Sequence, residues 1–552
     1  MTATKSTPLQ LITWVLILFP VLLYLSYGYR YSGPVFWGDD FDLLETVTLS
    51  PEATSLGQKL HLWTKQQNEH RVIVPRLITF LDYTVEGFIH WKTLILIANL
   101  IWVCILYFFW SAFRTLKLPA WMFIPVPWFL FQPQYYENHI WATSILQQSN
   151  VVFWLAFTVF AYARGYRKAA LLPAVLATFS HGSGLSSFLV ILFLVILERR
   201  WRLLPYWLVS SAVVMSLYFY QLEKGQSANF SESISNPVQL IGAFFAFSGS
   251  LTRVIVASPL AAVGTGFLMM LVLGSFVLPK LGKAIKSPRY KPRFFTVTLT
   301  GNLAFFVISA ALVAISRSWA GLEAIMPPRY QHYTVFLLGW TYLVILRYLS
   351  ERNSVRPAAL LFVAGGILFN VLSYIVYTPM VSFRNDYLTA DETNYLNHGQ
   401  FLQYHWTFNR NIRETYRKAL DKGVIRMERQ MPEIGDTTYP VDSAAALSFR
   451  VDKAPVVSNS NPAEEMLWLE GKFSSGKSLF VYLQPAQDSG YWIPLRGSRP
   501  AFRDLFLRGK TRGDAYHSEL YYANLPAGEY RVGILKDGQF SWTLHTLNVQ
   551  PE

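Results

Sequence analysis

Long apolar runs recur along the first 380 residues and limit the possible folds more than any other feature. A helix of about 20 apolar residues crosses the ~30 Å hydrocarbon core of a bilayer. Only 15% of the residues are charged, whereas a soluble domain has about a quarter. The sequence therefore predicts a polytopic α-helical membrane protein with about eleven transmembrane helices, some of them tilted, kinked or merged. The runs fall near residues 9–27, 94–113, 118–132, 148–163, 169–180, 184–197, 203–220, 256–279, 294–315, 333–349 and 357–379.

Basic residues cluster in every second loop between these runs, and this alternation predicts the orientation. Loops rich in Lys and Arg stay on the cytoplasmic side. We therefore expect a cytoplasmic N-terminus, an outer loop at 29–93 and an extracytoplasmic chain after about residue 381, in a bacterial inner membrane. The net charge of +14 then follows from topology and needs no nucleic acid as a partner. No small-residue cleavage site follows the first run, so we interpret it as a retained anchor.

The composition changes near residue 380 and predicts three regions: a transmembrane domain over 1–380, a helical connector over 381–440 and a β-sandwich over 441–552. The last region alternates apolar and polar residues between turn signals such as Asp537-Gly538, which is typical of short strands. Its expected place is extracytoplasmic. The single cysteine, Cys104, excludes a disulfide framework.

An acidic cluster opens the outer loop in the sequence "FWGDDFDLLE", which contains Asp39, Asp40, Asp42 and Glu45. Carboxylates this close to a membrane surface are costly unless they are used or well solvated. The functional interpretation makes Asp40, or else Asp39, a reacting group. The structural alternative is an N-terminal helix cap.

Two further outer segments carry candidate ligands for an anionic group. In "NEHRVIVPRL", Glu69, His70 and Arg71 stand together; the arginine could bind phosphate or only reach the interface with its stem on apolar surface. In "SRSWAGLEAIMPPRYQHY", Arg317 and Arg329 break the rule that outer loops lack basic residues, so a lipid-linked phosphate is a natural ligand for them. An ion pair with a carboxylate is the alternative. Residues Tyr330 and His332 follow Arg329 and suit a sugar site.

Two weaker signals are His139 in "YYENHIWATSILQQSN" and His181 in "SHGSGLSS". A lone histidine of this kind is more often structural than catalytic. The chain has no P-loop, GxGxxG, HExxH or GxSxG motif, which excludes the commonest soluble enzyme classes.

The order of these features resembles the GT-C superfamily of integral membrane glycosyltransferases. The resemblance rests on the first helix, the outer loop with "GDDFD", the many helices, the arginine in "PPRYQHY" and the C-terminal outer domain. Among its members, those that modify bacterial surface glycans or pilins look closest. No WWDYG-like motif occurs, which argues against transfer to an Asn sequon.

The resemblance implies an inverting transfer of a sugar from a polyprenyl-phosphate donor to a hydroxyl of a glycan, lipid or protein. Asp40, or Asp39, would be the general base, and Arg329 with Arg71 or Arg317 would neutralise the departing phosphate. No cofactor is certain; a divalent metal stays open, with Asp39, Asp42 and Glu69 nearby in sequence. The candidate substrate-binding residues are Glu69, His70, Tyr330, His332, His139 and His181.

Other classes fit part of this pattern. A polysaccharide polymerase or ligase would also hold a polyprenyl phosphate with outer arginines, but it needs no carboxylate after the first helix. A polyprenyl-linked lipid transporter would have charged residues inside its spans, where this sequence has almost none. A membrane scaffold without chemistry is the remaining alternative.

Overall fold

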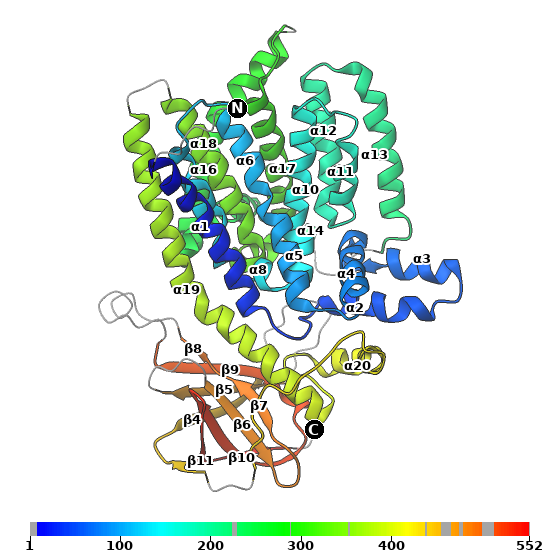
Figure 1. Ribbon diagram of the computed structural model, residues 1–552, viewed down its shortest axis with the longest axis vertical. Coiled ribbons are helices and arrows are strands. Elements are labelled where there is room, and N and C mark those ends of the chain that lie inside the picture. The colour runs from blue at the N-terminus through cyan, green and yellow to red at the C-terminus, as the bar shows by residue number, and fades with distance from the viewer. Residues whose placement is uncertain are drawn as a thin grey trace. The chain divides into compact units, whose positions relative to one another are not determined.

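The computed structural model describes residues 8–223, 229–287, 289–350, 354–435, 439–453, 465–473, 479–498 and 513–550. The chain divides into two compact units (Figure 1). Unit 1 comprises Met1–Arg30, Leu60–Ile78 and Ile95–Tyr374, and unit 2 comprises Tyr31–Lys59, Thr79–Leu94 and Ile375–Glu552.

Unit 1 is built from helices. Its longer helices, some of which continue into unit 2, are α1 (Pro8–Tyr31), α4 (Ile73–Glu86), α5 (Trp91–Val103), α6 (Ile105–Arg114), α10 (Asn150–Ala163), α12 (Ser186–Leu197), α13 (Leu204–Phe219), α15 (Pro237–Gly249), α16 (Pro259–Lys286), α17 (Phe294–Arg317), α18 (Gln331–Leu349) and α19 (Val355–His398). Shorter helices are α3 (Leu56–Thr64), α7 (Pro125–Leu130), α8 (Glu137–Ile140), α9 (Ala142–Ser144), α11 (Leu171–Thr178) and α14 (Phe230–Ser235). A small hairpin, β1 (Gln66–Gln67) and β2 (His70–Arg71), lies between α3 and α4.

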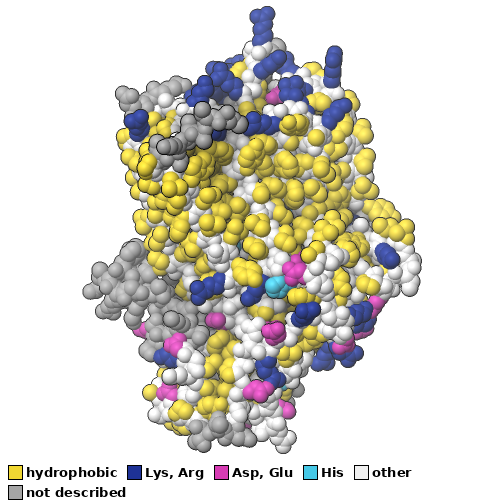
Figure 2. All heavy atoms as spheres, in the orientation of Figure 1, with side chains coloured by type: hydrophobic (Ala, Val, Ile, Leu, Met, Phe, Trp, Pro, Cys, Tyr) yellow, Lys and Arg dark blue, Asp and Glu magenta, His cyan; other side chains and the backbone are white. Residues whose placement is uncertain are grey.

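Seven helical segments within the described residues are long and apolar enough to cross a membrane, which is consistent with an integral membrane protein. They are Pro8–Tyr31, Trp91–Arg114, Ala142–Ala163, Trp201–Phe219, Pro259–Lys286, Phe294–Ala320 and Val355–His398. Their outer faces expose large apolar side chains, such as Val209, Val213 and Leu217 on α13. Figure 2 shows hydrophobic side chains spread over these helices, with Lys and Arg gathered at one end of unit 1.

The predicted count of about eleven spans is not confirmed, because four of the apolar runs do not form a span of that kind. The run near 118–132 is broken by Pro119, Pro125 and Pro127, since proline removes a helix hydrogen bond and clashes with the preceding turn. The runs near 169–180 and 184–197 form the short helices α11 and α12. The run near 333–349 forms α18, which begins with the polar pair Gln331-His332.

Helices α10, α12 and α17 pack against one another in unit 1. Gly301 of α17 makes the approach possible: a Cβ atom there would lie 2.6 Å from Val159 of α10 and 3.2 Å from Leu194 of α12. Both neighbours are fully buried. These three helices matter because each connects the two ends of unit 1 that carry the polar groups described below.

Unit 2 contains two sheets that share a hydrophobic core, together with helices α2 (Asp40–Leu49) and α20 (Trp406–Asp421). The sheet orders are β3-β11-β10-β6-β7 and β4-β5-β9-β8. Inward-facing residues of both sheets, such as Leu469, Val481 and Val532, have no exposed surface, as in a β-sandwich. The strands are β3 (Val441–Asp442), β4 (Ala446–Lys453), β5 (Glu465–Lys472), β6 (Leu479–Pro485), β7 (Tyr491–Pro494), β8 (Arg496–Gly497), β9 (Ala515–Tyr521), β10 (Gly528–Lys536) and β11 (Gln539–Val549).

The predicted turn at Asp537-Gly538 joins β10 to β11. Both residues have positive φ, at 50° and 84°, which is the backbone of a type I′ hairpin turn. Lys536 pairs with Gln539 directly across it. The C-terminal strands predicted from alternation are therefore present, in the described part of 441–552.

Candidate functional site

Three histidines that are far apart in sequence meet in unit 1, and we call His70, His181 and His332 the histidine cluster. His70 follows the hairpin turn at Asn68-Glu69, where Asn68 has a φ of 48°, a conformation that asparagine tolerates well. His181 precedes the turn η5 (Gly182–Leu185) and accepts a hydrogen bond from the Ser183 amide at 3.2 Å. His332 lies in the first turn of α18.

The rings of the histidine cluster are close to one another and to other polar groups. The ring centroids of His70 and His181 are 3.9 Å apart. The Gln148 side-chain nitrogen lies 3.0 Å from Nε2 of His181. Gly182 allows His70 to approach the turn that follows His181, because a Cβ atom at Gly182 would lie 2.9 Å from Nδ1 of His70.

Burial keeps the histidine cluster neutral at pH 7. It lowers the pKa of His70 to about 4 and that of His332 to about 3. It also lowers the pKa of His181, with a further contribution from His70 and His332. The rings can therefore exchange hydrogen bonds with a ligand but supply no positive charge.

Two buried ring nitrogens of the cluster make no hydrogen bond within the described chain: Nδ1 of His70 and Nε2 of His332. Buried polar atoms in native proteins almost always have a partner. These nitrogens could therefore pair with water or with the hydroxyl groups of a ligand.

Positive charge beside this cluster comes from Arg317 and Arg329. Their guanidinium carbons lie 5.8 Å and 5.5 Å from the centre of the same ring, that of Tyr330. Arg329 also contacts the Glu137 carboxylate at 3.2 Å. Within the described residues the Arg317 guanidinium has no hydrogen bond or ion pair, and its charge contributes to the lowered pKa of His70.

The backbone of this region is held by Asn138, whose amide nitrogen donates to the Arg329 carbonyl at 2.6 Å. Nδ1 of His332 lies 2.9 Å from the same carbonyl. Asn138 itself is fixed by the Ser144 hydroxyl. The loop that carries Arg329 is thus connected to the segment at Glu137 through both backbone and side chain.

Arg71, the third arginine of the predicted phosphate site, is held by the backbone. Its Nε donates to the Tyr218 carbonyl at 2.6 Å, and its two terminal nitrogens donate to the carbonyls of Thr64 and Tyr220. Arg71 is only 7% exposed. This geometry favours a structural role, in which Arg71 joins the β1–β2 segment to the end of α13.

The remaining sequence candidates of unit 1 differ in their surroundings. Glu69 lies at the β1–β2 turn and raises the pKa of His70, against the larger effect of burial. His139 is fully buried and stacks on Tyr24 with the ring centroids 3.6 Å apart. Its Nε2 donates to the Tyr24 carbonyl at 2.8 Å, so its contacts are those of a core residue.

The acidic cluster belongs to unit 2, and its two leading aspartates differ in exposure. Asp40 is 3% exposed and accepts a hydrogen bond from the Trp37 amide at 3.1 Å. Asp39 is exposed and stands at the N-cap position of α2, but its side chain makes no capping bond. Asp39 therefore occupies the predicted N-cap position, but its side chain does not form the capping hydrogen bond.

Aromatic packing holds the acidic cluster against the rest of unit 2. Phe36 is fully buried, and its ring centre lies 5.1 Å from that of Phe401 and 5.4 Å from that of Tyr404. The Tyr404 hydroxyl accepts a hydrogen bond from the Gly38 amide at 2.7 Å. The turn at Gly38, with its φ of 51°, is therefore held by the packing of Phe36 and by the hydrogen bond to Tyr404.

In the part of the chain that the structure describes, no group of three or more His, Cys, Asp or Glu side chains could hold a metal ion. The geometry of the described residues therefore does not support a metal ion bound by Asp39, Asp42 and Glu69.

Comparison with known proteins identifies no relative: no family model, no curated protein and no solved structure matches this chain.

Proposed function

We propose that this chain is a membrane-embedded, inverting glycosyltransferase of the GT-C kind. It would move a sugar from a polyprenyl-phosphate donor to a hydroxyl acceptor on the outer face of the membrane. The observation that carries the proposal is the convergence of Arg317 and Arg329 on the ring of Tyr330 beside the neutral histidine cluster. Two guanidinium groups suit a phosphate, and aromatic rings stack on sugar faces.

The donor would bind with its phosphate on the two arginines. Because Arg317 has no anionic partner within the described residues, a bound phosphate would be its counter-ion. Arg329 shares its charge with Glu137, which orients the guanidinium. The free nitrogens of His70 and His332 would accept from or donate to sugar hydroxyls.

In the reaction, Asp39 or Asp40 would take the proton of the acceptor hydroxyl as its oxygen attacks the anomeric carbon. The bond from that carbon to the phosphate oxygen breaks, and its electron pair leaves with the polyprenyl phosphate. The arginines stabilise the added negative charge on the phosphate. A single displacement inverts the configuration, because no second carboxylate forms a covalent intermediate.

Exposure favours Asp39 over Asp40 as the base, contrary to the preference from sequence. A general base must come within hydrogen-bond reach of the acceptor, and Asp39 is the exposed member of the pair. Asp40 already accepts the Trp37 amide, so its carboxylate would shape the turn.

The test is transfer of a labelled sugar from a polyprenyl-phosphate donor by the purified full chain in lipid, with Arg317→Gln and Asp39→Asn as the variants. The matched controls are Arg253→Gln, which removes an arginine that pairs with Glu323, and Asp42→Asn. Loss of transfer in the first pair alone supports the proposal. Full activity of both Arg317→Gln and Asp39→Asn would show that the proposed site is wrong. Movement of labelled lipid across vesicle membranes without sugar transfer would favour a transporter.

A further inference from the structure

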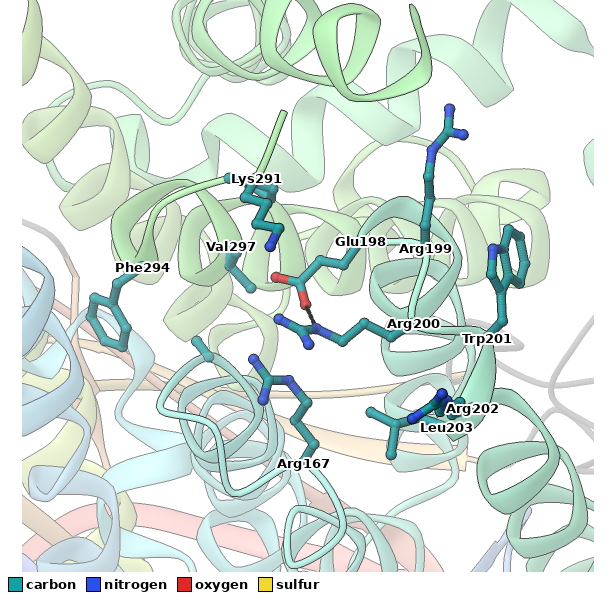
Figure 3. Close-up of a pocket in the computed structure, with 12 residues that line it drawn as sticks. Arg167, Glu198, Arg199, Arg200, Trp201, Arg202, Leu203, Lys291, Phe294 and Val297 are labelled. Atoms are coloured by element: carbon teal, nitrogen blue, oxygen red, sulfur yellow. Dashed lines mark hydrogen bonds and ion pairs between the residues drawn. The ribbon is translucent and has the colours of Figure 1, made fainter. Parts of the chain in front are cut away.

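A second polar site lies at the other end of α10, α12 and α17: a pocket of about 610 Å³ in unit 1 (Figure 3). It is formed where α10 and α12 end and where α17 begins. The inference drawn from it is independent of the proposed function, because none of its residues belongs to the histidine cluster.

The pocket carries a large excess of positive charge. Five basic side chains and one carboxylate line it, which leaves an excess of four positive charges. The charged lining residues are Arg167, Arg199, Arg200, Arg202, Lys291 and Glu198. Figure 3 shows Arg167, Arg200 and Lys291 directed at the same space as Glu198, whereas Arg199 extends away from it.

Glu198 orients Arg200 and leaves the charges of the other basic lining residues uncompensated. Its Oε2 accepts from Nε of Arg200 at 2.6 Å and from the Tyr162 hydroxyl at 3.1 Å. The Glu198 side chain is 10% exposed and that of Arg200 is 38% exposed. One carboxylate thus fixes one guanidinium at the edge of the pocket and leaves the other cations without an acidic partner there.

Arg167 provides an independent sign of a missing ligand. Its Nε is buried and makes no hydrogen bond within the described residues. The guanidinium carbon lies 5.8 Å from the centre of the Tyr162 ring, which places the group over the same tyrosine that contacts Glu198. A buried donor without an acceptor is costly, and an anionic oxygen would satisfy it.

Apolar side chains complete the lining. Trp201, Phe294 and Val297 contribute to the pocket, and Trp201 is 57% exposed. Tryptophan beside basic residues at a helix end is typical of the membrane interface. A free phosphate would bind only the basic residues of the lining, whereas a lipid would contact the basic and the apolar lining residues together.

We propose that this pocket binds the phosphate headgroup of an anionic phospholipid, held by Arg167 and Arg200, with its acyl chains against Trp201 and Phe294. Basic pockets between transmembrane helices bind anionic headgroups in this way. Basic residues that only fix the orientation of the protein in the membrane need to lie near the helix ends. They have no reason to point into one pocket in which a carboxylate orients a guanidinium.

The experiment measures binding of phosphatidylglycerol to the purified full chain in phosphatidylcholine nanodiscs, by native mass spectrometry and by thermal stabilisation. Arg167→Gln with Arg200→Gln should weaken binding about twentyfold. The matched control removes two charges outside the pocket, Lys283→Gln with Lys286→Gln, both exposed near the end of α16, and should weaken binding less than about threefold.

A third variant, Glu198→Gln, removes the only negative charge among the described lining residues and keeps a side-chain oxygen that can accept from Arg200. It should strengthen binding, which a misfolded protein could not do. Equal losses in the two double variants would overturn the proposal, as would weaker binding in Glu198→Gln. Stabilisation by inorganic phosphate alone, equal to that by phosphatidylglycerol, would replace the lipid with a free phosphate.

Discussion

The two ends of α10, α12 and α17 use arginine in opposite ways. At the histidine end, Arg317 and Arg329 stand beside buried neutral rings and share one tyrosine. At the basic end, five basic residues and one carboxylate line a pocket, and Arg167, Arg200 and Lys291 are directed into it (Figure 3). The 14 residues of α10 separate the ends by about 21 Å at ~1.5 Å per residue.

The number of basic residues at an end of the bundle and their positions in space are separate kinds of evidence for a binding site. Many cations at one end of a helical bundle are expected from membrane topology, so only their convergence on a pocket is informative. Arg317 and Arg329 are informative by themselves, because they lie beside buried neutral rings and away from the basic end. Each end can be changed by substitution without touching the residues of the other.

Removal of the Arg329 charge should have the largest effect. We expect Arg329→Gln to lower sugar transfer about a hundredfold, because the departing phosphate loses one of its two guanidinium groups. The measurement is the transfer rate at saturating donor. Arg253→Gln, which removes an arginine paired with Glu323, is the control, and an equal loss there would point to a general effect of charge.

Acid should destabilise the folded chain through the histidine end. In the folded state the pKa values of His70 and His332 are about 4 and about 3, below the ordinary value of about 6.5 in the unfolded chain. The stabilisation is therefore complete above pH 6.5 and is lost as the pH falls toward 4, because the unfolded chain takes up protons first. Each histidine contributes up to about 1.4 kcal/mol per pH unit in this window.

Thermal unfolding in detergent at pH 7.5 and pH 4.5 measures this loss. His70→Gln with His332→Gln should reduce the pH dependence, whereas a substitution of the exposed His61 should leave it unchanged. An unchanged dependence in the double variant would mean that other groups carry the effect, and the buried His139 would then be the first to examine.

The sequence predicted part of this arrangement and could not predict the rest. The apolar run at 9–27 and the Asp537-Gly538 turn carry local signals, so α1 and the β10–β11 hairpin followed from them. The runs at 169–180 and 184–197 were expected among the spans, but they form the short helices α11 and α12, because an apolar run predicts burial and does not by itself give the length of the helix. The contact between His70 and His181 joins residues over a hundred positions apart and depends on packing.

The role of Arg71 shows the same limit at a single residue. A guanidinium that donates to three backbone carbonyls and one that binds phosphate look alike in sequence. Gln148 is a second example, because the sequence shows it only as one of several polar residues and does not predict its contact with His181. This contact depends on the π-helical turn η4 (Ile145–Ser149) before α10. Such turns often mark functional sites but have no sequence signature.

A methyl group at Gly182 should disturb the histidine end alone. In Gly182→Ala the new Cβ would lie 2.9 Å from both Nδ1 of His70 and the Tyr218 hydroxyl, and such overpacking costs about 1–3 kcal/mol. The free energy of unfolding and phosphatidylglycerol binding are the two measurements. Gly264→Ala is the control, because nothing lies within 4 Å of its Cβ.

The smallest effect is expected when the basic end is changed and activity is measured. Arg167→Gln with Arg200→Gln should alter sugar transfer less than about twofold in phosphatidylcholine, because a rigid α10 would have to transmit any change over about 21 Å. If transfer fell in parallel with lipid binding, the two ends would be coupled through the helices that Gly301 brings together. Gly301→Ala, whose new Cβ would push Val159 and Leu194 away from α17, should then change both readouts at once, and a change in only one of them would exclude that route.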